Sequence, residues 1–164
     1  MDDQLKAFER VARALGGLSY QTPDEEGAIE HPFEFRNIHP ALPTKVRTLF
    51  DDGHYPQATF EAFKFIDKEI ARLASNSESG EKLMMKVFSE DNPLIKLTPC
   101  STTSQKDEQR GFKFLFAGSI VAIRNPRGHE YDLQDSPDEC LDHLAVASVL
   151  LRRLESAGFK ITVT

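Results

Sequence analysis

The amino-acid sequence predicts a mainly helical protein, a bundle of four or five helices with a minor pair of β-strands. Two stretches, residues 56–74 and 107–123, carry apolar residues at the three- and four-residue spacings of an amphipathic helix. A third stretch opens at Ser136 with a complete helix-capping signature. Alternating β-branched patterns occur only in short segments and no internal repeat is visible, so helices are expected to form the core.

The N-terminal part combines one helix with an irregular stretch. Residues 2–15 predict an amphipathic helix, ended by two glycines, whose apolar face consists of Leu5, Phe8, Ala12 and Leu15. Prolines interrupt residues 18–43, where only Phe33-Glu34-Phe35 alternates and predicts a short strand. A short helix capped by Thr44 is expected over residues 44–50, before an Asp-Asp-Gly turn.

The middle of the chain holds the two clearest apolar faces. The helix over residues 56–74 has a face made of Thr59, Phe63, Ile66, Ile70 and Leu73. Residues 82–88 then predict a short helix, and residues 91–106 a polar loop. The helix over residues 107–123 has a face made of Phe112, Leu115, Phe116, Ser119, Ile120 and Ile123. The small residues of this helix, which would let another helix approach closely, are Gly111, Gly118 and Ala122.

The last helix has the strongest start signal in the chain. Ser136-Pro137-Asp138-Glu139 combines an N-cap serine, a proline in the first turn and a glutamate three residues after the serine. Its apolar face continues with Leu141, Leu144, Ser148 and Leu151, and Gly158 ends it. The alternating tail, residues 159–164, predicts an edge strand that pairs with residues 33–36.

Composition narrows the class of protein. The chain has 164 residues, 40% of them hydrophobic and 28% charged, and no stretch reaches the roughly 18 apolar residues of a membrane helix. An acidic N-terminus without an apolar segment after it predicts a cytoplasmic protein without membrane contact. Cys100 and Cys140 lie far apart and outside any metal-ligand pattern, so plain thiols are expected. The net charge of −6 predicts that any RNA contact is small and transient.

The most informative short segment is Arg124-Asn125-Pro126-Arg127-Gly128-His129, at the end of a predicted helix. In a continuous helix Arg124 and His129 would lie about 140° apart around the axis and would not converge. Pro126 disfavours helical geometry in the residue before it, which predicts that the helix ends at Arg124. Gly128 then gives the chain freedom to turn back, so we expect a bent loop that presents the polar side chains together.

These side chains suit the cleavage of a phosphodiester beside a 2′-hydroxyl, as in RNA. His129 can take or donate a proton near neutral pH, while Arg124 stabilises the negative charge that develops on phosphorus. Asn125 and Arg127 would bind phosphate or orient the histidine. One arginine–histidine pair leaves either the general base or the general acid unassigned, so a two-fold dimer is expected to complete the site. This scheme needs no metal and no cofactor.

A purely structural interpretation of the same segment stays open. In a chain of this composition, an arginine followed by a histidine at one fixed spacing is expected about 0.3 times by chance. An arginine at a helix C-terminus also complements the helix dipole, and Asn-Pro-Arg-Gly is a good surface turn. The pattern alone therefore does not decide between a site and a turn.

Several segments together resemble the bacterial Ymh family, over about residues 39–154. They are Gly53–Ala58, Glu61–Lys64, Leu83–Met84, Val87–Phe88, Gly111, Leu115–Gly118 and Arg124–His129. That family is placed in the HEPN superfamily of helical-bundle domains, whose hallmark is an arginine, a polar residue and a histidine four to six residues beyond the arginine. The resemblance implies a HEPN-like helical domain over residues 39–164, preceded by an N-terminal helix and irregular extension over residues 1–38.

The resemblance also implies a function. It predicts a metal-independent endoribonuclease of the toxin or phage-defence type, as in abortive infection, which leaves 2′,3′-cyclic phosphate ends, with Arg124 and His129 as catalytic residues. The implied partners are RNA, a second copy of the chain, and an antitoxin or another defence protein. Some HEPN-like domains are not catalytic. The alternative is therefore a non-catalytic helical module that binds a protein or a nucleotide within a defence complex.

Four further residues are candidates for a supporting role. His54 and Tyr55 either join the site or shape the preceding turn, and Glu61 and Lys64 either support the histidine or form an ordinary surface ion pair. The remaining histidines have structural interpretations: turn residues for His31 and His39, and a solvated or bundle-lining position for His143.

Overall fold

Every regular element in the described part of the chain is a helix. The structure is a computed structural model that describes residues 30–130 and 132–163. Its helices confirm the prediction of a mainly helical bundle. The unit that holds these helices begins at His31, ahead of the boundary expected at residue 39, and Ile38 already belongs to its core. The helix predicted over residues 2–15 lies outside the described residues.

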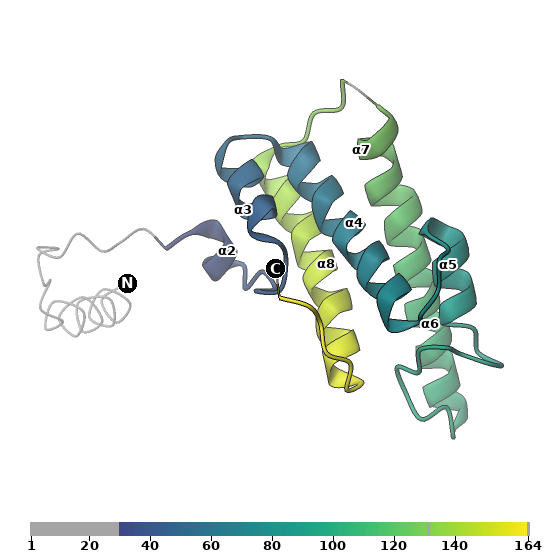
Figure 1. Ribbon diagram of the computed structural model, residues 1–164. Helices are drawn as coiled ribbons and strands as arrows, with labels where there is room; N and C mark the ends of the chain where they lie inside the picture. Colours follow the sequence, from purple (N-terminus) through teal and green to yellow (C-terminus); the bar gives the residue numbers. More distant parts are fainter. Residues whose placement is uncertain (1–29, 131, 164) are drawn as a thin grey trace, which may run out of the picture. The chain divides into compact units, whose positions relative to one another are not determined.

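The helices follow one another along the chain, and the longest connection between two described helices is the loop over residues 88–102, between α5 and α6 (Figure 1). In chain order they are α2 (Pro32–Phe35), α3 (Thr44–Asp51), α4 (Tyr55–Leu73), α5 (Gly80–Val87), α6 (Thr103–Ser119), the π-helix η1 (Ile120–Arg124), α7 (Asn125–His129) and α8 (Pro137–Ser156). Among the described helices, none is both long enough and apolar enough to cross a membrane.

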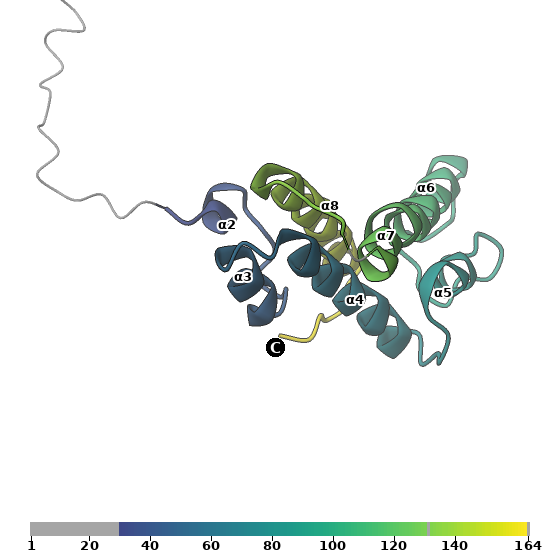
Figure 2. The same ribbon diagram turned by 90° about the horizontal axis from the view of Figure 1, so that it is seen from above.

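The central element is α4, which packs against α3, α5, α7, η1 and α8. Seen from above, α3 lies on one side of α4, and α8, α7 and α6 lie on the other (Figure 2). The apolar face predicted for this helix is confirmed, because Thr59, Phe63, Ile66 and Ile70 are fully buried. Burial of one continuous apolar face from several sides is what holds a helical bundle together.

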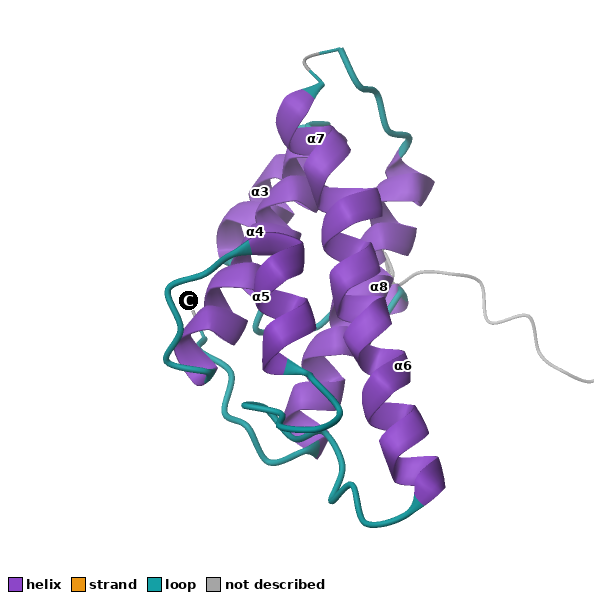
Figure 3. Cartoon of the chain, turned by 90° about the vertical axis from the view of Figure 1, so that its right-hand side faces the viewer, coloured by secondary structure: helices purple, strands orange, loops and turns teal. Residues whose placement is uncertain are grey.

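The helix α6 begins earlier than the sequence indicates. It starts at Thr103, because the hydroxyl of Thr102 accepts a hydrogen bond from the backbone N–H of Gln105 and caps it, so the predicted loop is shorter. Its core face holds Phe116, as predicted, and the helix lies beside α5 (Figure 3). Leu115 was predicted to belong to that face, but it is 55% exposed.

The predicted strand pair is wrong. Phe33 and its neighbours form the short helix α2, because Pro32 suits a first turn and the Nδ1 atom of His31 accepts a hydrogen bond from the Phe33 N–H. The C-terminal tail is extended but pairs with no strand in the described residues. Instead, Thr162 donates to the Glu69 carboxylate through its backbone N–H (2.7 Å) and its hydroxyl (3.1 Å), so α4 anchors the tail.

The two predicted helix caps differ in outcome. The capping box of α8 is confirmed, since the Ser136 hydroxyl accepts from the Glu139 N–H and the Glu139 carboxylate accepts from the Ser136 N–H. The cap assigned to Thr44 is wrong. Thr44 is the first residue of α3, Pro43 occupies the N-cap position, and no side chain caps this helix.

Candidate functional site

The segment Arg124–His129 is helical rather than a bent loop, so the prediction that the helix ends at Arg124 is wrong. The backbone N–H of Asn125 donates to the carbonyl of Ile120, five residues earlier, which makes η1 a π-turn between α6 and α7. Pro126 lacks an N–H and in a regular helix would clash with the carbonyl four residues before it. The wider π-turn places Pro126 in the first turn of α7, where a missing N–H is tolerated. The three elements α6, η1 and α7 therefore form one continuous helical rod over residues 103–129.

The helical course separates the two residues expected to form the site. Arg124 is half-buried and lies against α4, whereas His129 is exposed at the last turn of α7. Five residues of helix place their side chains on different sides of the axis. Within one chain, therefore, α7 does not fold His129 back onto Arg124.

An aromatic ring holds Arg124. Its guanidinium carbon lies 5.2 Å from the centroid of the Phe60 ring on α4, within the range of a cation–π interaction. Nη1 of Arg124 donates to Oδ1 of Asn125 at 3.1 Å, and Nε is buried with no hydrogen-bond partner in the described part of the chain. No carboxylate of residues 30–130 or 132–163 pairs with this guanidinium, so its charge is available to an anion.

A lysine adds positive charge at the same ring, and a second lysine shares its acidic partner. The ammonium group of Lys64 lies 5.6 Å from the Phe60 ring centroid and 3.1 Å from the Glu61 carboxylate, which also pairs with Lys45 at 3.2 Å. Burial raises the pKa of Glu61, but hydrogen bonds from Lys64 and Lys45 outweigh this and lower it, so the carboxylate stays charged. One carboxylate thus pairs with two lysines, and the ring beside Lys64 also holds Arg124, which leaves a local excess of positive charge.

Arg127 has a different environment from Arg124. Its Nε and Nη2 atoms donate to the two carboxylate oxygens of Asp135, both at 2.6 Å, and its Nη1 donates to the carbonyl of Ile123 at 2.9 Å. The side chains of the pair are 9% and 4% exposed. The buried bidentate pair and the bond to Ile123 tie the loop before α8 to η1. The Asp135 carboxylate also neutralises the charge of Arg127, which makes it less suited to the phosphate contact predicted from the sequence.

Beneath this ion pair lie two further groups of α8. The His143 ring is half-buried and its Nδ1 atom has no hydrogen-bond partner among the described residues. Burial lowers the pKa of His143, and the charge of Arg127 lowers it further against three neighbouring carboxylates. Burial raises the pKa of the Cys140 thiol to about 11, so this cysteine is an unreactive core residue.

A family model described as "Protein of unknown function (Hypoth_ymh)" matches residues 36–154. The chain belongs to the Ymh family. The match spans all of the helices from α3 to α7 and most of α8, and therefore the whole Arg124–His129 segment. No curated protein matches the chain, and no solved structure matches it.

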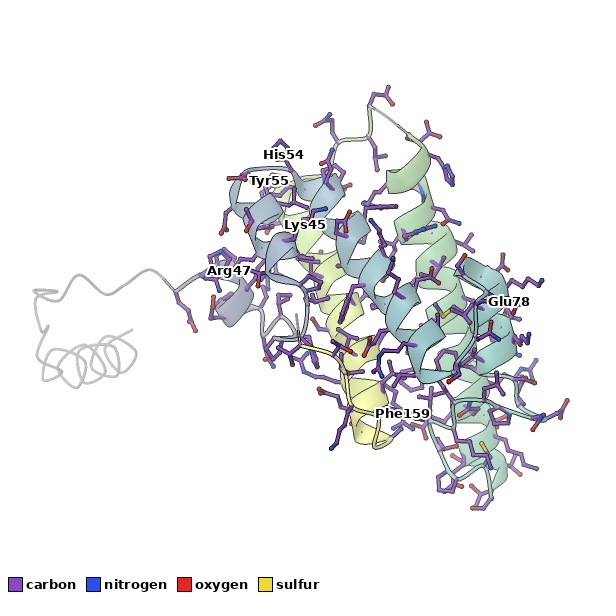
Figure 4. The ribbon with its side chains drawn as sticks, in the orientation of Figure 1. Lys45, Arg47, His54, Tyr55, Glu78 and Phe159 are labelled. Atoms are coloured by element: carbon purple, nitrogen blue, oxygen red, sulfur yellow. The ribbon has the colours of Figure 1, made fainter. Side chains whose placement is uncertain are left out.

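The other residues singled out from the sequence of this Ymh protein lie in three places. His54 and Tyr55 are where α4 begins (Figure 4), with Tyr55 against the ring of Phe50, 5.2 Å between centroids, and His54 exposed. His39 opens a turn, as predicted, because its carbonyl accepts a hydrogen bond from the Leu42 N–H and its Nδ1 atom accepts one from the Ala41 N–H, both at 3.1 Å. It is also 4% exposed, and its Nε2 atom lies 3.0 Å from the Glu155 carboxylate, so it anchors this turn to α8. His31 caps α2.

Sequence reasoning missed Phe60 and Asp135, the residues that determine the two arginine environments of the Ymh site. Phe60 lies beside the buried face of α4 and not on it, so no helical periodicity marks it. Asp135 stands just before the capping box and looks like an ordinary loop acid. A signal was present in Gly128: a glycine inside a helix needs a packing reason, and here the reason is the Phe60 ring.

Proposed function

We propose that this Ymh protein is a metal-independent endoribonuclease of the HEPN type, which acts in the cytoplasm as a toxin or in phage defence. The observation that supports the proposal is the unusual state of Arg124. It is a half-buried arginine without an acidic partner in the described residues, held over an aromatic ring beside a π-turn, with an exposed histidine five residues later. π-turns within helices are frequent at functional sites because they re-aim side chains at little structural cost.

The chemistry proceeds by transfer of one phosphoryl centre within the RNA. A neutral His129 imidazole takes the proton from a 2′-hydroxyl, whose oxygen attacks the adjacent phosphorus. The bond from phosphorus to the 5′-oxygen breaks, and a protonated imidazole gives its proton to that oxygen. The products are a 2′,3′-cyclic phosphate and a 5′-hydroxyl. Arg124 stabilises the extra negative charge on the phosphoryl oxygens in the transition state.

The scheme requires two imidazoles, one acting as base and one as acid, and a single chain supplies one His129. We therefore propose a homodimer in which the second copy completes the site. Its support is an apolar strip formed by residues of α6, η1 and α8 that are exposed in the single chain. The strip consists of Leu115, Gly118, Val121, Val146 and Val149.

The two halves of this strip are neighbours in the structure. On α8, Val146 and Val149 share a side with Arg153, which pairs with Glu108 of α6 at 2.9 Å. On α6, Gly118 has no atom within 4 Å of where a Cβ would stand, so another helix can approach closely there. Val121 lies on the same rod as His129, two helical turns before it. A partner bound to the strip would lie near the exposed imidazole.

The supporting residues take more limited roles than those predicted from sequence. Asn125 holds the Arg124 guanidinium through its Oδ1 atom, and Arg127 fixes the loop before α8. Lys64 adds positive charge beside the site, where a neighbouring phosphate of the RNA would lie. In a protein with a net charge of −6, this local basic cluster gives RNA a positively charged place to bind.

The test is cleavage of RNA by the purified full chain in excess chelator. We expect fragments with 2′,3′-cyclic phosphate ends, and no cleavage where the 2′-hydroxyl is replaced by hydrogen. His129→Ala should lower the rate by about 10²–10⁴-fold and Arg124→Ala by about 10²–10³-fold. Arg110→Ala removes an exposed arginine of α6 and is the matched control. Intact RNA with dimeric wild-type protein would overturn the proposal.

A second candidate function rests on the apolar strip alone. An exposed apolar surface of this kind also suits a non-catalytic module that binds an antitoxin or another defence protein. Expression in bacteria separates the two: an active ribonuclease should be toxic, and Arg124→Ala should relieve the toxicity. Leu115→Glu would abolish partner binding in a module, whereas in the ribonuclease it should convert the dimer to an inactive monomer, measurable by sedimentation.

A further inference from the structure

The Phe60 ring contacts the helical rod at two successive turns. A Cβ atom built on Gly128 would lie 2.7 Å from Cε2 of Phe60, closer than carbon atoms can approach, and 3.4 Å from Cδ2. Gly128 is helical, so the glycine is needed here for space and not for backbone freedom. One turn earlier, the same ring carries the guanidinium of Arg124 at 5.2 Å.

Phe60 is not part of the hydrophobic core. It is half-buried and belongs neither to the core cluster nor to the partly buried apolar residues packed against that cluster. The fully buried residues of α4 beside it, Thr59 and Phe63, fill the core without it. The Phe60 ring lies outside the core and contacts Arg124 and Gly128. Its contribution is therefore to the position of these two residues and not to the packing of the core.

The charges around the ring explain what that contribution is. An arginine beside a carboxylate would be neutralised by it, as Arg127 is by Asp135. An arginine over an aromatic ring is held in place while its charge and its outer N–H donors stay available to an anion. The buried Nε of Arg124, without a hydrogen-bond partner among the described residues, is consistent with a guanidinium positioned by the ring.

We propose that Phe60 is the positioning residue of this site: its ring holds the Arg124 guanidinium and, by its contact with Gly128, fixes the last turn of α7 from which His129 projects. The catalytic meaning of this arrangement rests on the proposed ribonuclease function, but the positioning itself does not. A glycine at position 128 and an aromatic ring at position 60 then form a matched pair, in which a change to one is felt at both Arg124 and His129.

The first measurement does not depend on activity. The Nε–Hε resonance of Arg124, assigned by its loss in Arg124→Lys, should be displaced by the ring current of Phe60. Phe60→Leu should move it to the position typical of an arginine without an aromatic neighbour. Phe114→Leu is the matched control, because that ring of α6 lies under the Lys113 ammonium at 4.8 Å and does not contact the site. If Phe60→Leu leaves the Arg124 resonance in place, the positioning role is wrong.

The second measurement tests the coupling between positions 60 and 128. Gly128→Ala should shift the Arg124 and His129 resonances in the wild-type background and much less in Phe60→Leu, whose smaller side chain leaves room for a methyl group. Each single change should lower RNA cleavage by about 10- to 100-fold through misplacement of the catalytic groups, and the double variant should be no slower than either. Independent, additive effects would overturn the proposal.

The two proposals fail in different ways. Coupled resonances with no RNA cleavage by the wild type would leave the positioning role standing and remove the ribonuclease. Cleavage that is lost in Arg124→Ala but unchanged in Phe60→Leu would do the reverse. Gly111→Ala, at a helical glycine with no atom within 4 Å of the added Cβ, should change neither the resonances nor the rate.

Discussion

Two arginines three residues apart on one helical rod have opposite environments. Arg127 is locked to a buried carboxylate by two hydrogen bonds, while Arg124 lies over the ring of Phe60 with no acid beside it in the described part of the chain. A buried bidentate pair neutralises the charge of a guanidinium and engages the donors that face the carboxylate, whereas an aromatic ring leaves both the charge and those donors available. The two residues are of the same type, so their different roles follow from their partners. Asp135 makes Arg127 a structural residue, and the Phe60 ring leaves Arg124 available for binding.

The largest expected effect comes from breaking the structural arginine. Arg127→Ala leaves the Asp135 carboxylate buried and unpaired, and should lower the free energy of unfolding by about 3–5 kcal/mol. Arg124→Ala removes a cation–π contact without stranding a charge and should cost about 1 kcal/mol. Urea unfolding of both variants measures the difference.

The control for this comparison removes both members of the pair. Arg127→Ala combined with Asp135→Ala should recover part of the lost stability, because no uncompensated charge remains. Equal destabilisation by Arg124→Ala and Arg127→Ala would contradict the division between a structural and a functional arginine.

Sequence patterns predicted those parts of the fold that depend on local signals. The buried face of α4 and the capping box of α8 follow from periodicity and from residues within one turn of each other. The π-turn did not follow, because the rule that proline ends a helix holds for α-helical geometry, and a wider turn removes the clash. The strand over residues 33–35 failed because a cap formed by His31 outweighs an alternation of three residues.

The candidate site also contains residues that local patterns predicted and residues that they did not. The segment from Arg124 to His129 was visible in the sequence because its residues are adjacent, and the family match spans it. Phe60 and Asp135 come from other elements, α4 and the loop before α8, and only the packing of those elements brings them to the rod. The residues that assign roles to the arginines were therefore the ones that local patterns could not identify.

An intermediate effect should separate the two helical glycines of the rod. Gly111→Ala adds a methyl group in open space and should stabilise the protein by about 0.5–1 kcal/mol through helix propensity. Gly128→Ala meets the Phe60 ring at 2.7 Å and should instead destabilise it by about 1–2 kcal/mol. Thermal unfolding gives the sign directly. Stabilisation by both substitutions would mean that the ring yields without resistance and sets nothing at α7.

The smallest expected effect is a dependence of the free energy of unfolding on pH, caused by His143 near Arg127. Burial lowers the pKa of His143 below its ordinary value of 6.5, and Arg127 adds to this, while Asp135, Glu139 and Asp142 oppose it without reversing it. The unfolded chain therefore binds a proton at His143 more readily than the folded one. Well above pH 6.5 His143 is neutral in both states, so it leaves stability unchanged there.

As the pH falls below 6.5, the free energy of unfolding should decrease until the folded pKa is passed, because protonation favours the unfolded chain. Urea titrations of wild type and His143→Gln between pH 7.5 and pH 5 measure the effect on the scale set by the ordinary histidine pKa of about 6.5. The stability of the wild type relative to the variant should decline as the solution becomes more acidic. A constant difference would show that His143 is solvated like a surface histidine, and that the charge of Arg127 is confined to its pair with Asp135. The same titration on Arg124→Ala should reproduce the wild-type profile, since Arg124 is not among the charges that act on His143.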